Sequence, residues 1–233
     1  FKIFKIYLKD INFSVAQGET VGLVGHTGSG KSSIINLLFR FYDPQSGQIL
    51  LDGQNIREFN RESVRDEMGI VLQEPYLFTG TIASNISMND ASITEEMIQD
   101  AINKVGARPM IDKLELGIHT PVVEKGQSLS SGERQLISFA RTLASNPKIL
   151  ILDEATSHID TETEEVIQHA MNVVKEGRTT FIIAHRLSTI QNADQIILLD
   201  QGMIKEHGNH QELLNLEGQY AEMFHMQAKA ATV

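Results

Sequence analysis

Short apolar runs and amphipathic stretches succeed one another along the chain, and their spacing predicts a mixed α/β fold. Residues 21–24, 149–152, 180–184 and 196–199 are largely aliphatic runs of strand length, which is typical of buried strands. Residues 48–51 lie between two Gly-containing turns and predict another short strand. Residues 203–206 follow the turn dipeptide Gln201-Gly202, so we expect them to pair with 196–199.

Helical periodicity begins after the first third of the chain. Thr94 is a candidate N-cap for a helix with acidic residues in its first turn. Thr161 and Glu164 form a T-x-x-E capping box for a helix that ends near Gly177, which makes 149–184 a strand–helix–strand unit. A final helix is predicted from Asn209 onward. The apolar stripe expected on the helix after Thr94 consists of Met97, Ile98, Ala101, Ile102 and Val105.

Composition fits a globular chain of one or two domains and excludes several classes of function. Of the 233 residues, 41% are hydrophobic, which is enough for a core. The net charge of −10 argues against a nucleic-acid surface. The absence of cysteine excludes disulfides and thiol chemistry and fits a reducing compartment. No apolar run approaches the ~18 residues that a bilayer span requires. Because Phe1 replaces an initiator Met and no signal peptide follows, we expect a piece of a longer protein.

One stretch between the apolar runs 21–24 and 34–39 matches the phosphate-loop pattern G-x-x-x-x-G-K-[ST]. Its glycines let backbone N–H groups point at phosphate, and the N-terminus of the following helix adds positive potential. Lys31 is expected to reach the β- and γ-phosphates, Ser32 to ligate Mg²⁺, and His26 to be an exposed bystander. The candidate nucleotide-binding residues here are Gly25, His26, Thr27, Gly28, Ser29, Gly30, Lys31, Ser32 and Ser33.

Two carboxylates, Asp153 and Glu154, directly follow the apolar run 149–152. The end of such a strand is where α/β proteins bind ligands. Asp153 suits coordination of Mg²⁺ beside Ser32, and Glu154 suits acceptance of a proton from a water molecule that attacks the γ-phosphate. Together with the phosphate loop, these residues predict hydrolysis of a nucleoside triphosphate.

The ordered set of motifs resembles the nucleotide-binding domain of an ABC transporter, over essentially the whole chain. Gln73 resembles the glutamine that contacts Mg²⁺ or the attacking water and faces the transmembrane helices in that family. His185 resembles the histidine that contacts the γ-phosphate, and Glu124 resembles the exporter loop that contacts the transmembrane helices; a solvated carboxylate is an equal reading of Glu124. Residues 157–160 resemble the loop that crosses the dimer interface, with His158 where a small residue is more common.

The segment 129–135 opens a predicted helix and resembles the signature motif of the same family. There, two domains dimerise head to tail, and the signature of one caps the γ-phosphate held by the phosphate loop of the other. Ser130 and Gly132 match the pattern, whereas Ser131 replaces a glycine and Glu133 replaces a glutamine. Ser131 adds a side chain where the backbone must come close, and Glu133 brings negative charge toward phosphate unless Arg134 or solvent neutralises it.

The resemblance implies a phosphate-loop NTPase fold of the ABC type. Its parts are a RecA-like α/β core, an N-terminal antiparallel β subdomain, and a helical signature subdomain inserted at about 81–143. ATP and Mg²⁺ are the implied cofactors. Phe1 and Tyr7 are the candidates for the aromatic residue that stacks on adenine in this family; packing in the core of the β-rich part is at least as good an interpretation of both.

Segments 38–44 and 78–86 are similar to exporters in which this domain follows a transmembrane region in one chain. The resemblance therefore implies a second ABC ATPase domain and transmembrane domains as partners, no nucleic acid, and a place at the cytoplasmic face of the cell membrane. Intact Glu154 and His185 beside an altered signature also resemble one half of heterodimeric bacterial exporters; a homodimer that tolerates Ser131 is the rival interpretation. Soluble ABC ATPases of DNA repair or translation, and a sensor that binds ATP without hydrolysis, remain as alternatives.

Overall fold

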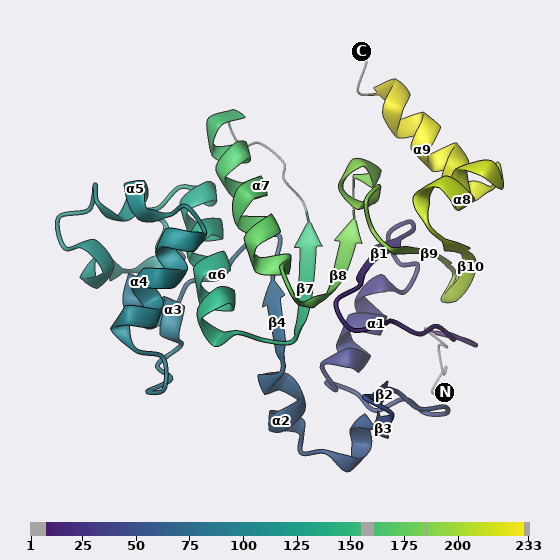
Figure 1. Ribbon diagram of the computed structural model, residues 1–233, viewed down its shortest axis with the longest axis horizontal. Coiled ribbons are helices and arrows are strands. Elements are labelled where there is room, and N and C mark those ends of the chain that lie inside the picture. Colours follow the sequence, from purple (N-terminus) through teal and green to yellow (C-terminus); the bar gives the residue numbers. More distant parts are fainter. Residues whose placement is uncertain (1–7, 155–160, 185, 231–233) are drawn as a thin grey trace, which may run out of the picture. The chain divides into compact units, whose positions relative to one another are not determined.

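The computed structural model describes residues 8–154, 161–184 and 186–230, and its elements are drawn in Figure 1. The chain divides into two compact units. The first consists of Phe1–Met68 and Thr179–Val233, and the second of Gly69–Arg178. Each unit combines helices with strands of a central sheet, so the predicted mixed α/β class is confirmed.

The first unit holds four neighbouring strands in the order β10-β9-β1-β8. β1 (Thr20–Val24) runs parallel to β8 (Thr179–Ala184) and to β9 (Gln195–Asp200), and β10 (Met203–Gly208) runs antiparallel to β9. All of the apolar side chains of β1 are fully buried. Positive φ angles at Gln201 (49°) and Gly202 (77°) form the tight turn of the predicted hairpin.

Two predictions about the first unit are wrong in extent. The strand expected over 48–51 shrinks to β2 (Leu50–Leu51), which pairs with β3 (Gln54–Asn55), and Leu50 is 51% exposed. With so little apolar surface to bury, a longer pairing gains little stability. The predicted final helix is two helices, α8 (His210–Asn215) and α9 (Gln219–Ala230). The carboxylate of Glu206 accepts hydrogen bonds from the backbone N–H groups of Gln219 (2.6 Å) and Tyr220 (3.1 Å), which starts a new helix.

Further helical elements of the first unit lie between β1 and the second unit in sequence. α1 (Lys31–Leu38) follows β1, and a 3₁₀ turn at Ile56–Glu58 precedes α2 (Arg61–Asp66). Arg40 joins these segments, because its guanidinium donates to the backbone oxygens of Ile56 (2.9 Å) and Phe59 (2.6 Å).

The second unit is mostly helical. β4 (Met68–Val71) and β7 (Ile149–Glu154) are neighbours in the central sheet, and β5 (Gly80–Thr81) pairs with β6 (Pro121–Val122). The longest helices are α6 (Ser131–Ser145) and α7 (Thr161–Lys175), and α6 packs against α3, α4 and α7. The shorter helices are α3 (Ile82–Ser87), α4 (Glu95–Lys104) and α5 (Arg108–Ile111). The boundaries predicted for a helical subdomain at 81 and 143 stay a prediction.

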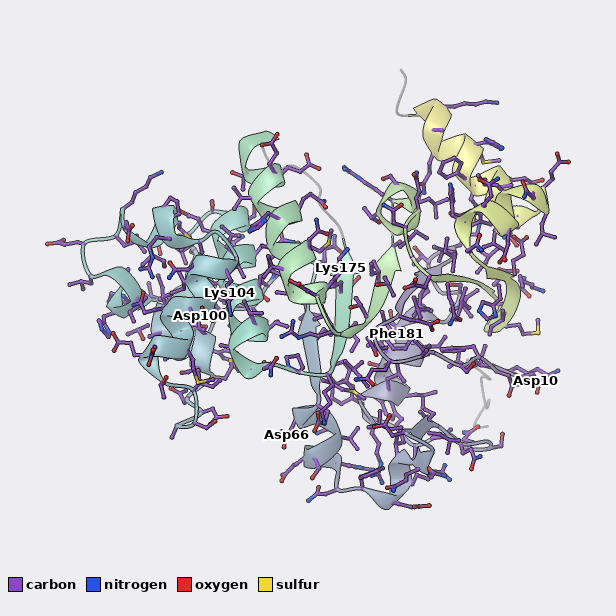
Figure 2. All side chains as sticks on the ribbon, viewed as in Figure 1. Asp10, Asp66, Asp100, Lys104, Lys175 and Phe181 are labelled. Atoms are coloured by element: carbon purple, nitrogen blue, oxygen red, sulfur yellow. The ribbon has the colours of Figure 1, made fainter. Side chains whose placement is uncertain are left out.

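Helix α4 shows where periodicity predicts well and where it fails. Its cap is the predicted one, because the hydroxyl of Thr94 accepts from the N–H of Met97. The stripe is buried except for Met97, which is 41% exposed, so that part of the prediction is wrong. Asp100 and Lys104 pair at 2.7 Å, one turn apart on the exposed face of the helix (Figure 2). Helix α7 begins at Thr161, so the expected cap is itself the first helical residue.

None of the helices within the described ranges is long and apolar enough to cross a membrane.

The buried hydroxyl of Tyr220 makes stability depend on pH. It lies 2.7 Å from Nδ1 of His210, and burial raises the pKa of Tyr220 to about 12. An unfolded tyrosine titrates near pH 10. The native state therefore keeps this proton where the unfolded state has lost it, and the stabilisation is complete below about pH 10 and lost as pH rises toward 12.

We predict that the free energy of unfolding, measured by urea titration between about pH 9 and 12, falls more steeply in the parent chain than in Tyr220→Phe, by about 2 kcal/mol in total. The phenylalanine variant loses the hydroxyl and also its contact with His210. The quantity compared is therefore the slope of the unfolding free energy against pH, not its absolute value. Equal slopes for the two chains would refute the prediction.

Candidate functional site

The predicted phosphate loop connects the buried strand β1 to helix α1, as the motif requires. Gly25 has φ 139°, and a Cβ there would lie 2.1 Å from the backbone oxygen of Leu199, so only glycine fits. Gly28 (φ 81°) and Gly30 (φ 116°) also have positive φ, and Gly30 is the N-cap of α1. The conformation of the loop therefore requires glycine at Gly25, where a side chain would collide with β9. It favours glycine at Gly28 and Gly30, where φ is positive.

Hydrogen bonds hold the loop in place. The N–H of Ser29 donates to the oxygen of His26 (3.1 Å), and the oxygen of Ser29 accepts from the N–H of Gly202 (2.9 Å) in the β9–β10 turn. The ammonium of Lys31 donates to the oxygens of Gly25 (2.6 Å) and His26 (3.1 Å). Lys31 is only 8% exposed. The loop thus holds a nearly buried positive charge at its centre, which suits an anionic ligand.

The first turn of α1 supplies further donors. Amides in the first turn of a helix have no partner one turn back, and together they carry a positive partial charge. Ser32 is exposed at the second position of α1, where its hydroxyl can reach a ligand. Ser29 has a buried hydroxyl with no hydrogen-bond partner among the described atoms. His26 and Thr27 are exposed, as expected for His26.

The second unit brings the predicted polar residues to the ends of two neighbouring strands. Asp153 is half-buried near the end of β7, Glu154 is the last residue of β7, and Gln73 is exposed two residues beyond the end of β4. Figure 1 shows β4 and β7 running in the same direction, so Gln73, Asp153 and Glu154 lie at one edge of the sheet. Carboxylate and amide groups collected at this edge can bind a cation or orient water.

The predicted signature segment forms the N-terminus of α6. Ser130 is the N-cap: its hydroxyl accepts from the N–H of Glu133 (3.2 Å), and its own N–H donates to the carboxylate of Glu133 (2.7 Å). The pattern S-x-x-E encodes this reciprocal capping box and is the signal by which the sequence could have revealed it. Arg134 donates to the oxygen of Leu129 (2.5 Å), so its guanidinium is engaged by the backbone of the preceding loop.

The two small residues of the signature have different surroundings. Ser131 is exposed. Gly132 is buried, and a Cβ there would lie 2.4 Å from Cγ2 of Thr163 on α7. Glycine is thus required at position 132 for close contact between α6 and α7, independently of any role of its backbone N–H in the signature.

A polar cluster that the sequence did not reveal joins α6 to the segment after β4. The side chain of Asn85 is buried and exchanges hydrogen bonds with both backbone groups of Phe78 (2.8 Å each). Arg141 on α6 donates to the oxygens of Asn85 (2.7 Å) and Tyr76 (3.3 Å). Burial lowers the pKa of Arg141. Asn85 and Arg141 are single polar residues far apart in the sequence, so no local sequence pattern identifies them as hydrogen-bonding partners.

Several predicted site residues lie outside the described part of the chain. These are Phe1, Tyr7, the segment 157–160 and His185. The side chains of Glu124 and Glu154 are likewise not described, although the backbone of each is. The roles of these residues stay predictions.

Gly132 and Thr163 provide a test of packing at the signature. We predict that Gly132→Ala lowers the free energy of unfolding by about 1–3 kcal/mol, because the new methyl group collides with Cγ2 of Thr163. Thr163→Ser removes that methyl group and keeps the hydroxyl, so the double variant should recover most of the loss. Thermal or urea unfolding of the four chains of this double-mutant cycle measures the coupling. Additive effects of the two substitutions would disprove the steric explanation.

Comparison with known proteins agrees with this geometry. Residues 8–157 match the family model described as ABC transporter. The chain is 66% identical over 220 residues to a probable multidrug resistance ABC transporter ATP-binding/permease protein, YheH, of Bacillus subtilis, with 94% of the chain and 33% of that protein covered. It is 49% identical to an ATP-dependent lipid A-core flippase of Saccharophagus degradans, with 94% and 38% covered.

A solved structure is similar over nearly the whole chain. It is a bacterial Atm1-family ABC exporter with ATP bound, at 45% identity and a TM-score of 0.88, with 95% of this chain and 39% of that chain covered. The chain therefore spans between about a third and two fifths of the length of these relatives. The predicted fold of the ABC type is confirmed, and the chain belongs to the ABC transporter family, as an ATPase domain of that family.

Proposed function

We propose that this domain binds ATP with Mg²⁺, closes head to tail on a second ABC ATPase domain, hydrolyses the ATP, and thereby powers export through membrane-spanning domains. The observation that carries the proposal is the nearly buried Lys31 ammonium inside a loop whose backbone admits only glycine at Gly25. Such a loop binds polyphosphate through backbone amides, a fixed cation and a helix N-terminus together.

Gly25 to Ser33 would hold the phosphates, and their chemistry fits. The loop amides and Lys31 would neutralise the β- and γ-phosphates, and the same loop contains the buried Ser29 hydroxyl, which has no hydrogen-bond partner among the described atoms. Ser32, Asp153 and Gln73 offer hydroxyl, carboxylate and amide oxygens, the ligands that Mg²⁺ prefers alongside phosphate and water. When bound, Mg²⁺ would offset charge on the β- and γ-phosphates.

Hydrolysis would proceed by in-line attack of water on the γ-phosphate. Glu154, the last residue of β7, would accept the proton of that water, and Gln73, which follows β4 at the same sheet edge, would orient it. His185, directly after β8, would steady the transferring group. Tyr7 or Phe1 would stack on adenine. These assignments rest on motif order and on the positions of the strand ends.

A second ABC domain completes the site, because the proposed γ-phosphate ligands of the signature belong to the other chain. Ser130, Ser131 and Gly132 begin α6, and its first turn offers amides and a hydroxyl to an anion. Ser131 is exposed and Glu133 is folded back onto Ser130, so neither departure from the family pattern blocks this face. This favours a competent half-site and self-association over a partner chain that must supply the missing function.

Exposed hydrophobic side chains support a membrane-spanning partner. Tyr76 and Phe78 are 46% and 50% exposed and pack edge to face at 5.0 Å, and Leu72 and Val123 are also exposed. Glu124 follows Val123 in the exporter-type loop. The similar proteins are named as a multidrug resistance transporter, a flippase and an exporter, so we place the domain at the cytoplasmic face of the cell membrane. The cargo would be chosen by the membrane-spanning part. The net charge of −10 disfavours the alternative of a soluble ABC ATPase acting on nucleic acid.

We predict that the 233-residue chain hydrolyses ATP in the presence of Mg²⁺ with a specific activity that rises with protein concentration, because the site needs two domains. Glu154→Gln should lower kcat at least about 100-fold while ATP binding is retained, since the amide cannot accept the proton. Phosphate release and equilibrium binding of ATP measure the two properties. Glu165→Gln on α7 makes the same charge change outside the proposed site and serves as the control.

Three results would separate the alternatives. Turnover that Glu154→Gln leaves unchanged would refute the assignment of Glu154. ATP binding without turnover at every protein concentration would favour an obligate partner chain or an ATP sensor. Tight binding of DNA or ribosomes at physiological salt would favour the soluble class.

A further inference from the structure

The carboxylate of Glu133 is the feature of the signature that the proposed function leaves without a role. We propose that Glu133 is a positioning residue: it selects which donors of α6 remain for the partner's nucleotide, and its negative charge weakens the closed state of the dimer. The proposal rests on the proposed function, since it concerns the same signature half-site.

The capping box decides which backbone N–H groups at the start of α6 remain available to a ligand. The N-cap and the first three residues of a helix have four amides without helical partners. In α6 the N–H of Ser130 donates to Glu133, and the N–H of Glu133 donates to the hydroxyl of Ser130. The two amides that the capping box leaves over are those of Ser131 and Gly132. They are adjacent and lie in the first turn, where N–H groups point out of the helix toward an approaching anion.

The hydroxyl of Ser130 becomes a third donor. Because its oxygen accepts from the N–H of Glu133, a lone pair is used and its single hydrogen is left to donate. Within the described residues that hydrogen has no acceptor, and Ser130 is exposed. The capping box therefore fixes the rotamer of Ser130 and leaves one O–H and two N–H groups available together.

The same carboxylate carries an electrostatic cost. Glu133 is half-exposed in the first turn, and it forms no ion pair within the described part of the chain. The guanidinium of Arg134, the neighbouring cation, donates to the backbone of Leu129 instead. A negative charge this close to a bound polyphosphate repels it, and added salt screens that repulsion.

Two substitutions separate positioning from charge. Glu133→Gln keeps an oxygen that can accept from the N–H of Ser130 and removes the charge. Glu133→Ala removes both. The matched control is Glu212→Gln in the first unit, where Asn209 and Glu212 form an equivalent capping box on α8, with the N–H of Asn209 donating to Glu212 at 2.9 Å.

The experiment measures ATP-dependent self-association by sedimentation velocity, with each substitution placed in the Glu154→Gln chain so that ATP is not consumed. At about 0.05 M salt, Glu133→Gln should tighten association roughly fivefold, and at about 0.5 M salt the gain should shrink to less than about twofold. Glu133→Ala should associate less tightly than Glu133→Gln at both salt concentrations, because the N–H of Ser130 loses its carboxylate acceptor and the start of α6 is held less firmly. Glu212→Gln should match the parent.

The outcomes are distinct. If Gln and Ala have the same effect, or if the gain from Gln is independent of salt, the assigned role of Glu133 is wrong although the proposed function stands. If Glu212→Gln tightens association as much as Glu133→Gln, net charge rather than position is responsible, and the inference is likewise overturned. If the parent binds ATP yet stays monomeric at all concentrations, self-association itself fails, and this inference falls with it.

Discussion

The steric constraint at Gly25 is the feature on which the proposed site depends. The loop after β1 lies so close to the end of β9 that a single methyl group at Gly25 would come within 2.1 Å of the oxygen of Leu199. Close approach lets the loop curl around the ammonium of Lys31 and direct its backbone toward a ligand, while the bond from Gly202 to Ser29 anchors it to the β9–β10 turn. The parallel strands of the first unit thus serve as a rigid base for the loop, whose amides would bind phosphate in the proposed function without themselves titrating.

The start of α6 also presents backbone amides to an anion in the proposed function, but by a different arrangement of the backbone. The phosphate loop uses glycine conformations, whereas the signature uses a capping box that removes two amides from competition and leaves two. Gly132 is needed there for contact with Thr163, so its lack of a side chain serves packing as well as access. The buried side chain of Asn85 and the half-buried Arg141 then hold α6 to the exposed aromatic segment at 76–78.

Much of the fold follows from the sequence because buried strands and capped helices leave local patterns. The runs around 21–24 and 196–199 and the cap at Thr94 were predicted for that reason. Prediction failed where long-range contacts decide: Glu206 starts α9, and Met97 faces solvent despite its spacing. The phosphate loop and the acidic end of β7 were readable as motifs. The Asn85–Arg141 cluster was not, because its hydrogen bonds join residues 56 positions apart.

The central claim is that the phosphate loop of one chain meets the signature of another. The chain contains no cysteine, so His26→Cys and Ser131→Cys each introduce a single exposed thiol. We would mix the two variants in the Glu154→Gln background, with a tag on one, and treat them with a short thiol-specific cross-linker. The account predicts a mixed cross-linked dimer that forms only with ATP and Mg²⁺. Cross-linking only between identical variants, or none at saturating ATP, would contradict it.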